Sequence, residues 1–255
     1  MTEKLGRSPL LAGTLALSAA GFFLRRHHLA TGFDAAGLPT GRGIAVLAVL
    51  CVLAVCFFAA AALTAKKRPA FRENFPASAP AAVLMVLAAG LLAAGCATEL
   101  MEASPLMTRG QLLLGRITGA LGIITGLCFV AMAATWNKGK KPGAAPWLLP
   151  LVYYIVQMIF SFKSWSTDPI VLDYCFKLFS LICVMLGALD AAGFVFDAGS
   201  RRRTIFFCLC GVFFSCVTLA DGGISHMMRT GGSALFLLAT LWQLLGKAPA
   251  EEQAQ

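Results

Sequence analysis

The amino-acid sequence predicts an all-α fold, a polytopic integral membrane helical bundle of about eight transmembrane helices joined by short connections. The first observation is composition: 58% of the 255 residues are hydrophobic and only 13% are charged, whereas soluble domains carry about 25% charged residues. The second is that the apolar residues come in stretches near the roughly 20 residues that cross about 30 Å of hydrocarbon. These stretches are continuously apolar rather than alternating, which favours helices over a barrel.

Eight apolar stretches are predicted as spans within a single transmembrane domain that covers residues 1–255. In chain order they are about 8–24, 44–65, 81–101, 112–135, 146–162, 170–197, 204–220 and 231–246. The second, residues 44–65, is the cleanest of them. No connection is long enough to form a separate domain.

Three dipeptides are typical of helix starts: Ser8-Pro9, Ser104-Pro105 and Asp168-Pro169. A Ser or Asp oxygen accepts hydrogen bonds from the free N–H groups of a first turn, and proline is tolerated there because it needs no partner. The span 112–135 has a different signal. Its glycines, Gly115 with Gly119 and Gly122 with Gly126, form two G-x-x-x-G pairs, which predict close contact with a neighbouring helix.

Prolines recur along the chain at similar intervals. Pro39 and Pro105 are 66 residues apart, Pro105 and Pro169 are 64 apart, and each precedes an apolar span. One interpretation is four tandem helical hairpins of about 64 residues in the same orientation, the parallel repeat found in some transporters. The alternative is that eight evenly spaced spans produce such intervals unaided.

Every second connection is basic, which predicts the topology. Thirteen of the 21 Lys and Arg residues fall on one side: Lys4, Arg7, Lys66, Lys67, Arg68, Arg72, Lys138, Lys140, Lys141, Arg201, Arg202, Arg203 and Lys247. By the positive-inside rule this side is cytoplasmic and holds both termini, in what we expect is the plasma membrane. The basic connections are placed to meet the lipid bilayer at its anionic headgroups. This placement accounts for the net charge of +9 without nucleic-acid binding.

Arg25 and Arg26 disagree with this topology, because they follow the first span on the side expected to be outside. A cleaved signal peptide is one explanation. Lys4 and Arg7 precede a short apolar stretch, and the small residues 18–20 resemble a processing site. The other seven spans keep their orientation in either case.

The sequence gives no indication of a cofactor, a metal site or a catalytic residue. It contains no H-E-x-x-H, G-x-S-x-G or G-x-x-x-x-G-K-[ST] motif. The nine cysteines fall inside or at the edges of spans, where they are expected to pack as small apolar residues rather than to form disulfides. The sequence therefore favours a protein without enzymatic activity over an enzyme.

Opposite charges gather at the outer ends of the spans, and two interpretations stay open. Asp168 caps a helix, and Asp173 can pair with Lys177 four residues later on one helix face. The charges would then only cap helices and tie hairpins together. Alternatively, they form a polar mouth that binds a small charged ligand.

Two polar side chains lie well inside predicted spans. Asp190 has apolar neighbours on both sides, and exposing its carboxylate to lipid near a helix centre would cost roughly 2.5–3.5 kcal/mol. It should therefore face the bundle interior, where Gln157 is the other embedded polar residue. The candidate ligand-binding residues are Asp190, Gln157, Lys177, Asp173, Glu99, Glu102, Arg116 and Asp221.

These observations predict a multi-pass membrane protein that is transporter-like or binds a small ligand. The alternative is a non-catalytic membrane scaffold, or a subunit that binds a partner protein within a larger membrane complex. Water access shared by Asp190, Gln157 and Lys177 would favour the first interpretation.

Overall fold

The structure, a computed structural model, describes residues 7–32, 42–66, 71–101, 109–139, 141, 143–165 and 174–246. Within these residues the regular secondary structure is all helical. The long helices are α1 (Arg7–Thr31), α2 (Arg42–Leu63), α4 (Ala79–Met101), α5 (Arg109–Asn137), α6 (Ala145–Trp165), α7 (Cys175–Gly193), α8 (Arg201–Thr218) and α9 (Ile224–Leu244). Three short helices accompany them: α3 (Phe71–Asn74), η2 (Phe194–Phe196) and η3 (Leu219–Asp221).

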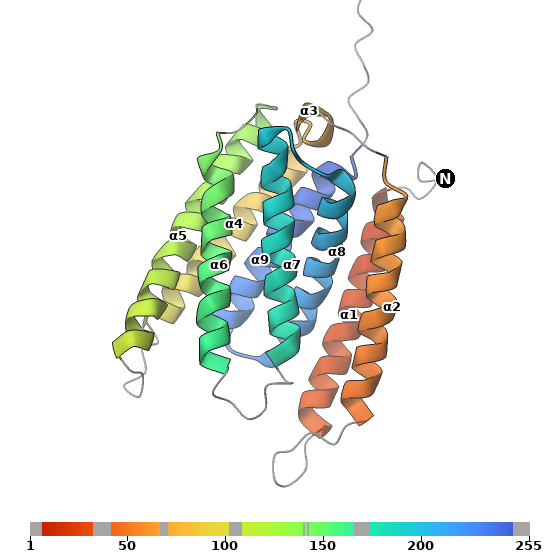
Figure 1. Cartoon of the computed structure of the whole chain (residues 1–255), viewed down its shortest axis with the longest axis vertical. Helices are drawn as coiled ribbons and strands as arrows, with labels where there is room; N and C mark the ends of the chain where they lie inside the picture. Colours follow the sequence, from red (N-terminus) through yellow and green to blue (C-terminus); the bar gives the residue numbers. More distant parts are fainter. Residues whose placement is uncertain are drawn as a thin grey trace, which may run out of the picture.

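Six of these helices close into a ring. Going around it, α4 packs on α5, α5 on α6, α6 on α7, α7 on α8, α8 on α9, and α9 returns to α4. The hairpin of α1 and α2 lies outside and rests on α8 (Figure 1). We call α4 to α9 the six-helix ring. The tandem-repeat interpretation stays a prediction.

Seven of the described helices are long and apolar enough to cross a membrane: Ser8–Thr31, Gly43–Leu63, Ala79–Met101, Leu112–Asn137, Ala145–Lys163, Cys175–Phe196 and Arg201–Asp221. This confirms a polytopic helical membrane protein. Helix α9, which overlaps most of the predicted span 231–246, has a comparable length of 21 residues. It falls outside this group because its first half includes His226, Arg229 and Ser233.

Two predicted boundaries are wrong because polar residues were assigned to connections. The first helix continues past residue 24 to Thr31, and α9 begins at Ile224 rather than at 231. Polarity ends a span only where the side chain would otherwise meet lipid. Arg25 is fully buried and Arg229 is half-buried, so both are carried on helices that turn them into the protein.

The glycines of α5 make the predicted helix contact. A Cβ added at Gly122 would meet Sγ of Cys96, and one at Gly126 would lie 3.1 Å from the carbonyl O of Ala89, both on α4. Gly119 faces Leu100 of the same helix. A Cβ added at Gly115 would meet nothing within 4 Å, so this glycine does not contribute to the interface.

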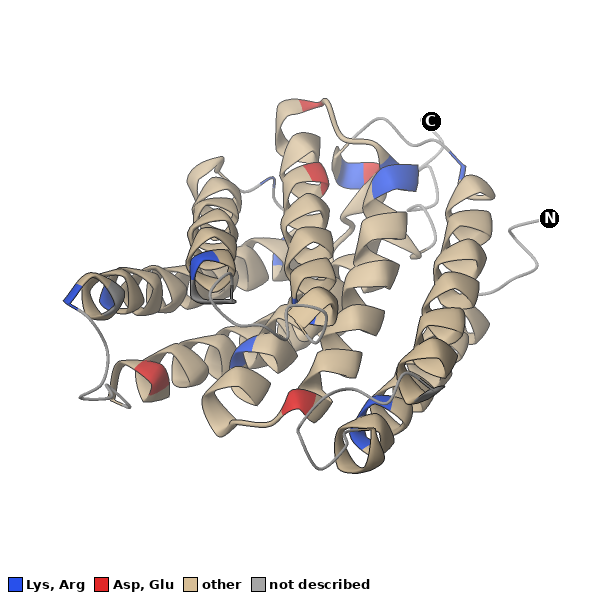
Figure 2. Ribbon diagram, turned by 60° about the horizontal axis from the view of Figure 1, so that its bottom comes forward, with Lys and Arg blue, Asp and Glu red and all other residues tan. Residues whose placement is uncertain are grey.

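The chain alternates direction, so the described basic residues of three connections meet at one end, which we call the basic end (Figure 1). Lysine and arginine residues lie mainly towards the helix ends, and the middle of the bundle is largely uncharged (Figure 2). At the basic end an aromatic cluster fills the space beneath α3. Phe75 lies 5.6 Å from the rings of Trp136 and Trp147 and 5.5 Å from that of Phe194.

Arg201 donates its hydrogen bonds within the protein. Its position in a basic connection had instead predicted contact with lipid headgroups. The last carbonyl groups of a helix have no intrahelical partner. Arg201 donates from Nη1 to the carbonyl O of Lys66 at 2.9 Å, and from Nε to that of Leu244 at 3.2 Å. Arg202 donates to Ala65 at 3.0 Å. The start of α8 therefore ties down the ends of α2 and α9.

Replacing Arg201 by Lys should test this link. Lysine keeps the charge but cannot reach several carbonyls with a planar fork, so we expect a loss of about 1 kcal/mol in the free energy of unfolding. Unfolding in mixed SDS micelles, followed by circular dichroism, measures this change. The matched control is Arg203→Lys, since the side chain of Arg203 is 65% exposed. Equal stability of the Arg201 variant and the parent would contradict the link.

Candidate functional site

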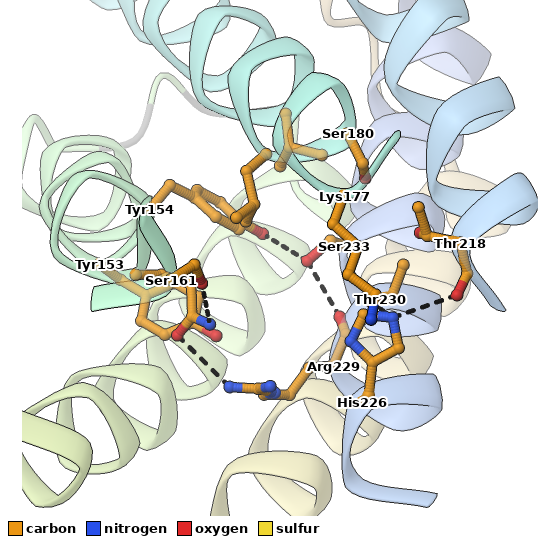
Figure 3. A pocket seen from close by; sticks show the side chains of 13 residues that line it. Tyr153, Tyr154, Ser161, Lys177, Ser180, Thr218, His226, Arg229, Thr230 and Ser233 are labelled. Carbon is orange, nitrogen blue, oxygen red and sulfur yellow. Dashed lines mark hydrogen bonds between the residues drawn. The ribbon is translucent and has the colours of Figure 1, made fainter. Parts of the chain in front are cut away.

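A polar cavity of about 70 Å³ lies inside the six-helix ring (Figure 3). Its lining residues belong to the helix ends opposite the basic end. Helices α6, α7 and α9 provide most of its wall. We call this the pocket end. The lining residues are Tyr153, Tyr154, Gln157, Ser161, Lys177, Ser180, Leu181, Val184, Thr218, His226, Arg229, Thr230 and Ser233.

The lining follows from helical periodicity. Residues three, four and seven positions apart share one face of a helix. On α9 the lining positions are 226, 229, 230 and 233; on α7 they are 177, 180, 181 and 184; and on α6 they include 154, 157 and 161. Each helix therefore turns one narrow polar stripe inward while its other faces meet neighbouring helices or lipid.

Hydrogen bonds connect α6 to α9 across the cavity wall. The hydroxyl of Tyr154 donates to Oγ of Ser233 at 3.1 Å, and Ser233 donates to the carbonyl O of Arg229 at 3.0 Å (Figure 3). Gln157 donates from Nε2 to Oγ of Ser161 at 3.4 Å. Behind the cavity, Oγ of Ser180 lies 2.9 Å from Oγ of Ser215 and joins α7 to α8.

Arg229 is the cation of the α9 wall. Its Nη1 pairs with Oε2 of Glu99 on α4 and donates to Oε1 of Gln157 at 3.4 Å. Its Nε–H is buried and has no hydrogen-bond partner among the described residues. The guanidinium thus joins three helices and retains an unused donor.

Lys177 is the cation of the α7 wall, and it shares a carboxylate with Arg25. Nε of Arg25 lies 2.7 Å from Oδ1 of Asp221, and Nζ of Lys177 lies 3.6 Å from Oδ2. The Arg25 guanidinium also lies 5.3 Å from the ring of Phe176. Asp221, in η3, therefore connects α1, outside the ring, to α7 within it.

His226 lies on the same face of α9 as Arg229 and lines the cavity with it. It precedes the apolar half of α9, and its Nε2 lies 3.1 Å from the carbonyl O of Thr218. The imidazole therefore adds a hydrogen-bonding group to the cavity wall.

The structure brings only some of the sequence-predicted residues together. Gln157 and Lys177 line the cavity, while Glu99 and Asp221 stand behind it as partners of Arg229 and Lys177. Arg116 is exposed on α5 and is not among the lining residues. Glu102 and Asp173 lie outside the described residues, so the predicted pairing of Asp173 with Lys177 is not addressed.

Asp190 does not meet Gln157. It lies near the opposite end of α7, where Oδ1 accepts from Nη2 of Arg203 at 2.6 Å. Asp190 is 7% exposed, as expected of a carboxylate that avoids lipid. Asp190 therefore does not line the cavity with Gln157 and Lys177, and a local ion pair satisfies its carboxylate.

The candidate set omitted His226, Arg229, Tyr154 and Ser233, although a signal was present. The predicted span begins at residue 231, which places His226 and Arg229 in the preceding connection. Polar residues at positions 226, 229, 230 and 233 share one face of a helix, which indicates that this face contacts water or other polar groups.

The arrangement can hold a few water molecules or a small polar solute by hydrogen bonds and charge. Within the described residues, no group of three or more His, Cys, Asp or Glu is placed to hold a metal ion. No protein-family model matches the chain, and comparisons with curated proteins and with solved structures find no match.

Proposed function

We propose that the protein is a transporter-like membrane protein that binds a small polar solute in the cavity of its six-helix ring. The observation that carries the proposal is a polar cavity between α9 and two helices that are long and apolar enough to cross a membrane, α6 and α7. Polar and ionisable side chains within membrane helices are costly, and they commonly mark solute or ion pathways. Here α6, α7 and α9 turn theirs towards one point.

The surroundings of the cavity fit a site reached from one side. The side chains of Lys177 and Arg229 are 20% and 14% exposed, so solvent reaches both. At the other end of the ring the aromatic cluster is fully packed, with Trp136 and Trp147 almost completely buried. A solute would enter at the pocket end and meet a closed floor, which is the geometry of one state of an alternating-access protein.

Filling the cavity tests this function. Thr230→Phe places a ring in the cavity, whereas Met227→Phe places the same ring on the exposed outer face of α9. A bound solute raises the melting temperature of the protein by mass action. We expect at least one of acetate, phosphate, acetamide and methylammonium to stabilise the parent and the Met227 variant in nanodiscs, but not the Thr230 variant. Equal shifts in all three proteins, or no shift in any, would contradict the proposal.

A further inference from the structure

We infer that the cavity selects a small oxyanion, of the carboxylate or phosphate class, and binds it between Lys177 and Arg229. This inference rests on the proposed function and names its ligand class. The lining residues include two basic side chains, Lys177 and Arg229, and no acidic residue. The wall therefore presents positive charge to a solute.

The counterions leave part of this positive charge available. Asp221 makes its short contact, 2.7 Å, with Arg25, and its 3.6 Å contact with Lys177 is longer than a hydrogen bond. Arg25 thus neutralises most of the carboxylate. The three ammonium donors of Lys177 are held only loosely, and a ligand oxygen in the cavity can accept from them.

Arg229 offers a second, differently shaped donor. Glu99 and Gln157 engage its Nη1, and its buried Nε–H has no partner among the described residues. A planar guanidinium suits oxyanions, which accept two parallel hydrogen bonds. A buried donor without an acceptor is unfavourable, so an oxyanion would supply the acceptor that this group lacks.

The size of the cavity limits the ligand. At 10–15 Å³ for each water, about 70 Å³ holds roughly five waters. An ion with a few heavy atoms fits this space, whereas a nucleotide or a whole sugar does not. The shared chemistry is an oxyanion head, either free in solution or on a lipid headgroup.

The test measures the melting temperature of the full chain in nanodiscs against sodium acetate and sodium phosphate at constant ionic strength. We expect saturable stabilisation by at least one anion, and at least a tenfold weaker apparent affinity in Lys177→Gln. That variant leaves Asp221 paired with Arg25, so it should fold. Arg229→Lys, which keeps the charge, should retain part of the affinity. Arg116→Gln removes an exposed charge of the same sign and should change nothing.

The outcomes separate this inference from the proposed function. If acetamide or methylammonium stabilises the protein and Thr230→Phe abolishes the effect, while neither anion acts, the solute site stands and the oxyanion inference fails. Stabilisation by an anion that is equal in Lys177→Gln also overturns the inference. If no probe acts, both fail. Added phosphatidylglycerol identifies the source: it competes with phosphate for a headgroup site and leaves a soluble-ion site unchanged.

Discussion

Replacing Arg25 by Met is expected to lower the free energy of unfolding by about 3–5 kcal/mol, because it leaves Asp221 buried without its closest cation. Arg25 is fully buried, the side chain of Asp221 is 3% exposed, and the two lie 2.7 Å apart. The pair also joins α1 to the end of α8 near the cavity. Unfolding in mixed SDS micelles measures the change.

Two further variants make the expectation specific. Lys141→Met breaks the exposed pair with Asp197, whose side chains are 42% and 70% exposed, and should cost at most about 1 kcal/mol. Arg25→Met combined with Asp221→Leu should recover part of the loss, because the buried carboxylate that Arg25 neutralises is removed as well. A loss below about 1 kcal/mol for Arg25→Met alone would show that the pair does not hold α1 in place.

Replacing Gly232 by Ala is the second substitution expected to lower the free energy of unfolding strongly, because it would force α4 and α9 apart. A Cβ at Gly232 would lie 2.7 Å from the backbone N of Leu92 and 2.9 Å from the carbonyl O of Ala88. Backbone atoms of a packed helix cannot move aside as a flexible side chain can. We expect a loss of about 1–3 kcal/mol, together with weaker solute binding, since Arg229 and Ser233 move with α9.

The matched control for Gly232 is Gly90→Ala on α4, where nothing lies within 4 Å. There alanine relieves the entropic penalty of glycine and should stabilise the helix by about 0.5–1 kcal/mol. Both variants can be compared by melting temperature in nanodiscs and by the solute shifts described above. The same response from both substitutions would contradict a close α4–α9 contact.

The positions of the spans were predictable because a helix that meets lipid needs a continuous stretch of apolar residues. Such a stretch can be found from local composition alone. The apolar stretch 44–65, for example, corresponds closely to α2 (Arg42–Leu63). The start of α9 was not predictable by this criterion. Arg229 is tolerated in this helix because it pairs with Glu99, which lies 130 residues earlier in the chain. The residues around position 229 do not indicate which residue that partner is.

The candidate site was predictable in part, for the same reason. Gln157 and Lys177 were identifiable as polar residues in or beside apolar stretches. Their grouping was not, because it depends on how far α6 and α7 rotate about their axes when they pack. Asp190 had the same local signal as Gln157, yet Arg203, 13 residues later, satisfies it.

The polar first half of α9 also has a consequence for biosynthesis. A segment with an arginine near its entry is a poor substrate for insertion from the translocon into lipid on its own. Among the described helices α9 is the last to leave the ribosome, and by then α4 and α8 have been made. The nascent segment can therefore pack beside helices that already present Glu99 to Arg229. We expect Glu99→Leu to lower the amount of folded protein recovered from cells, in addition to any effect on solute binding.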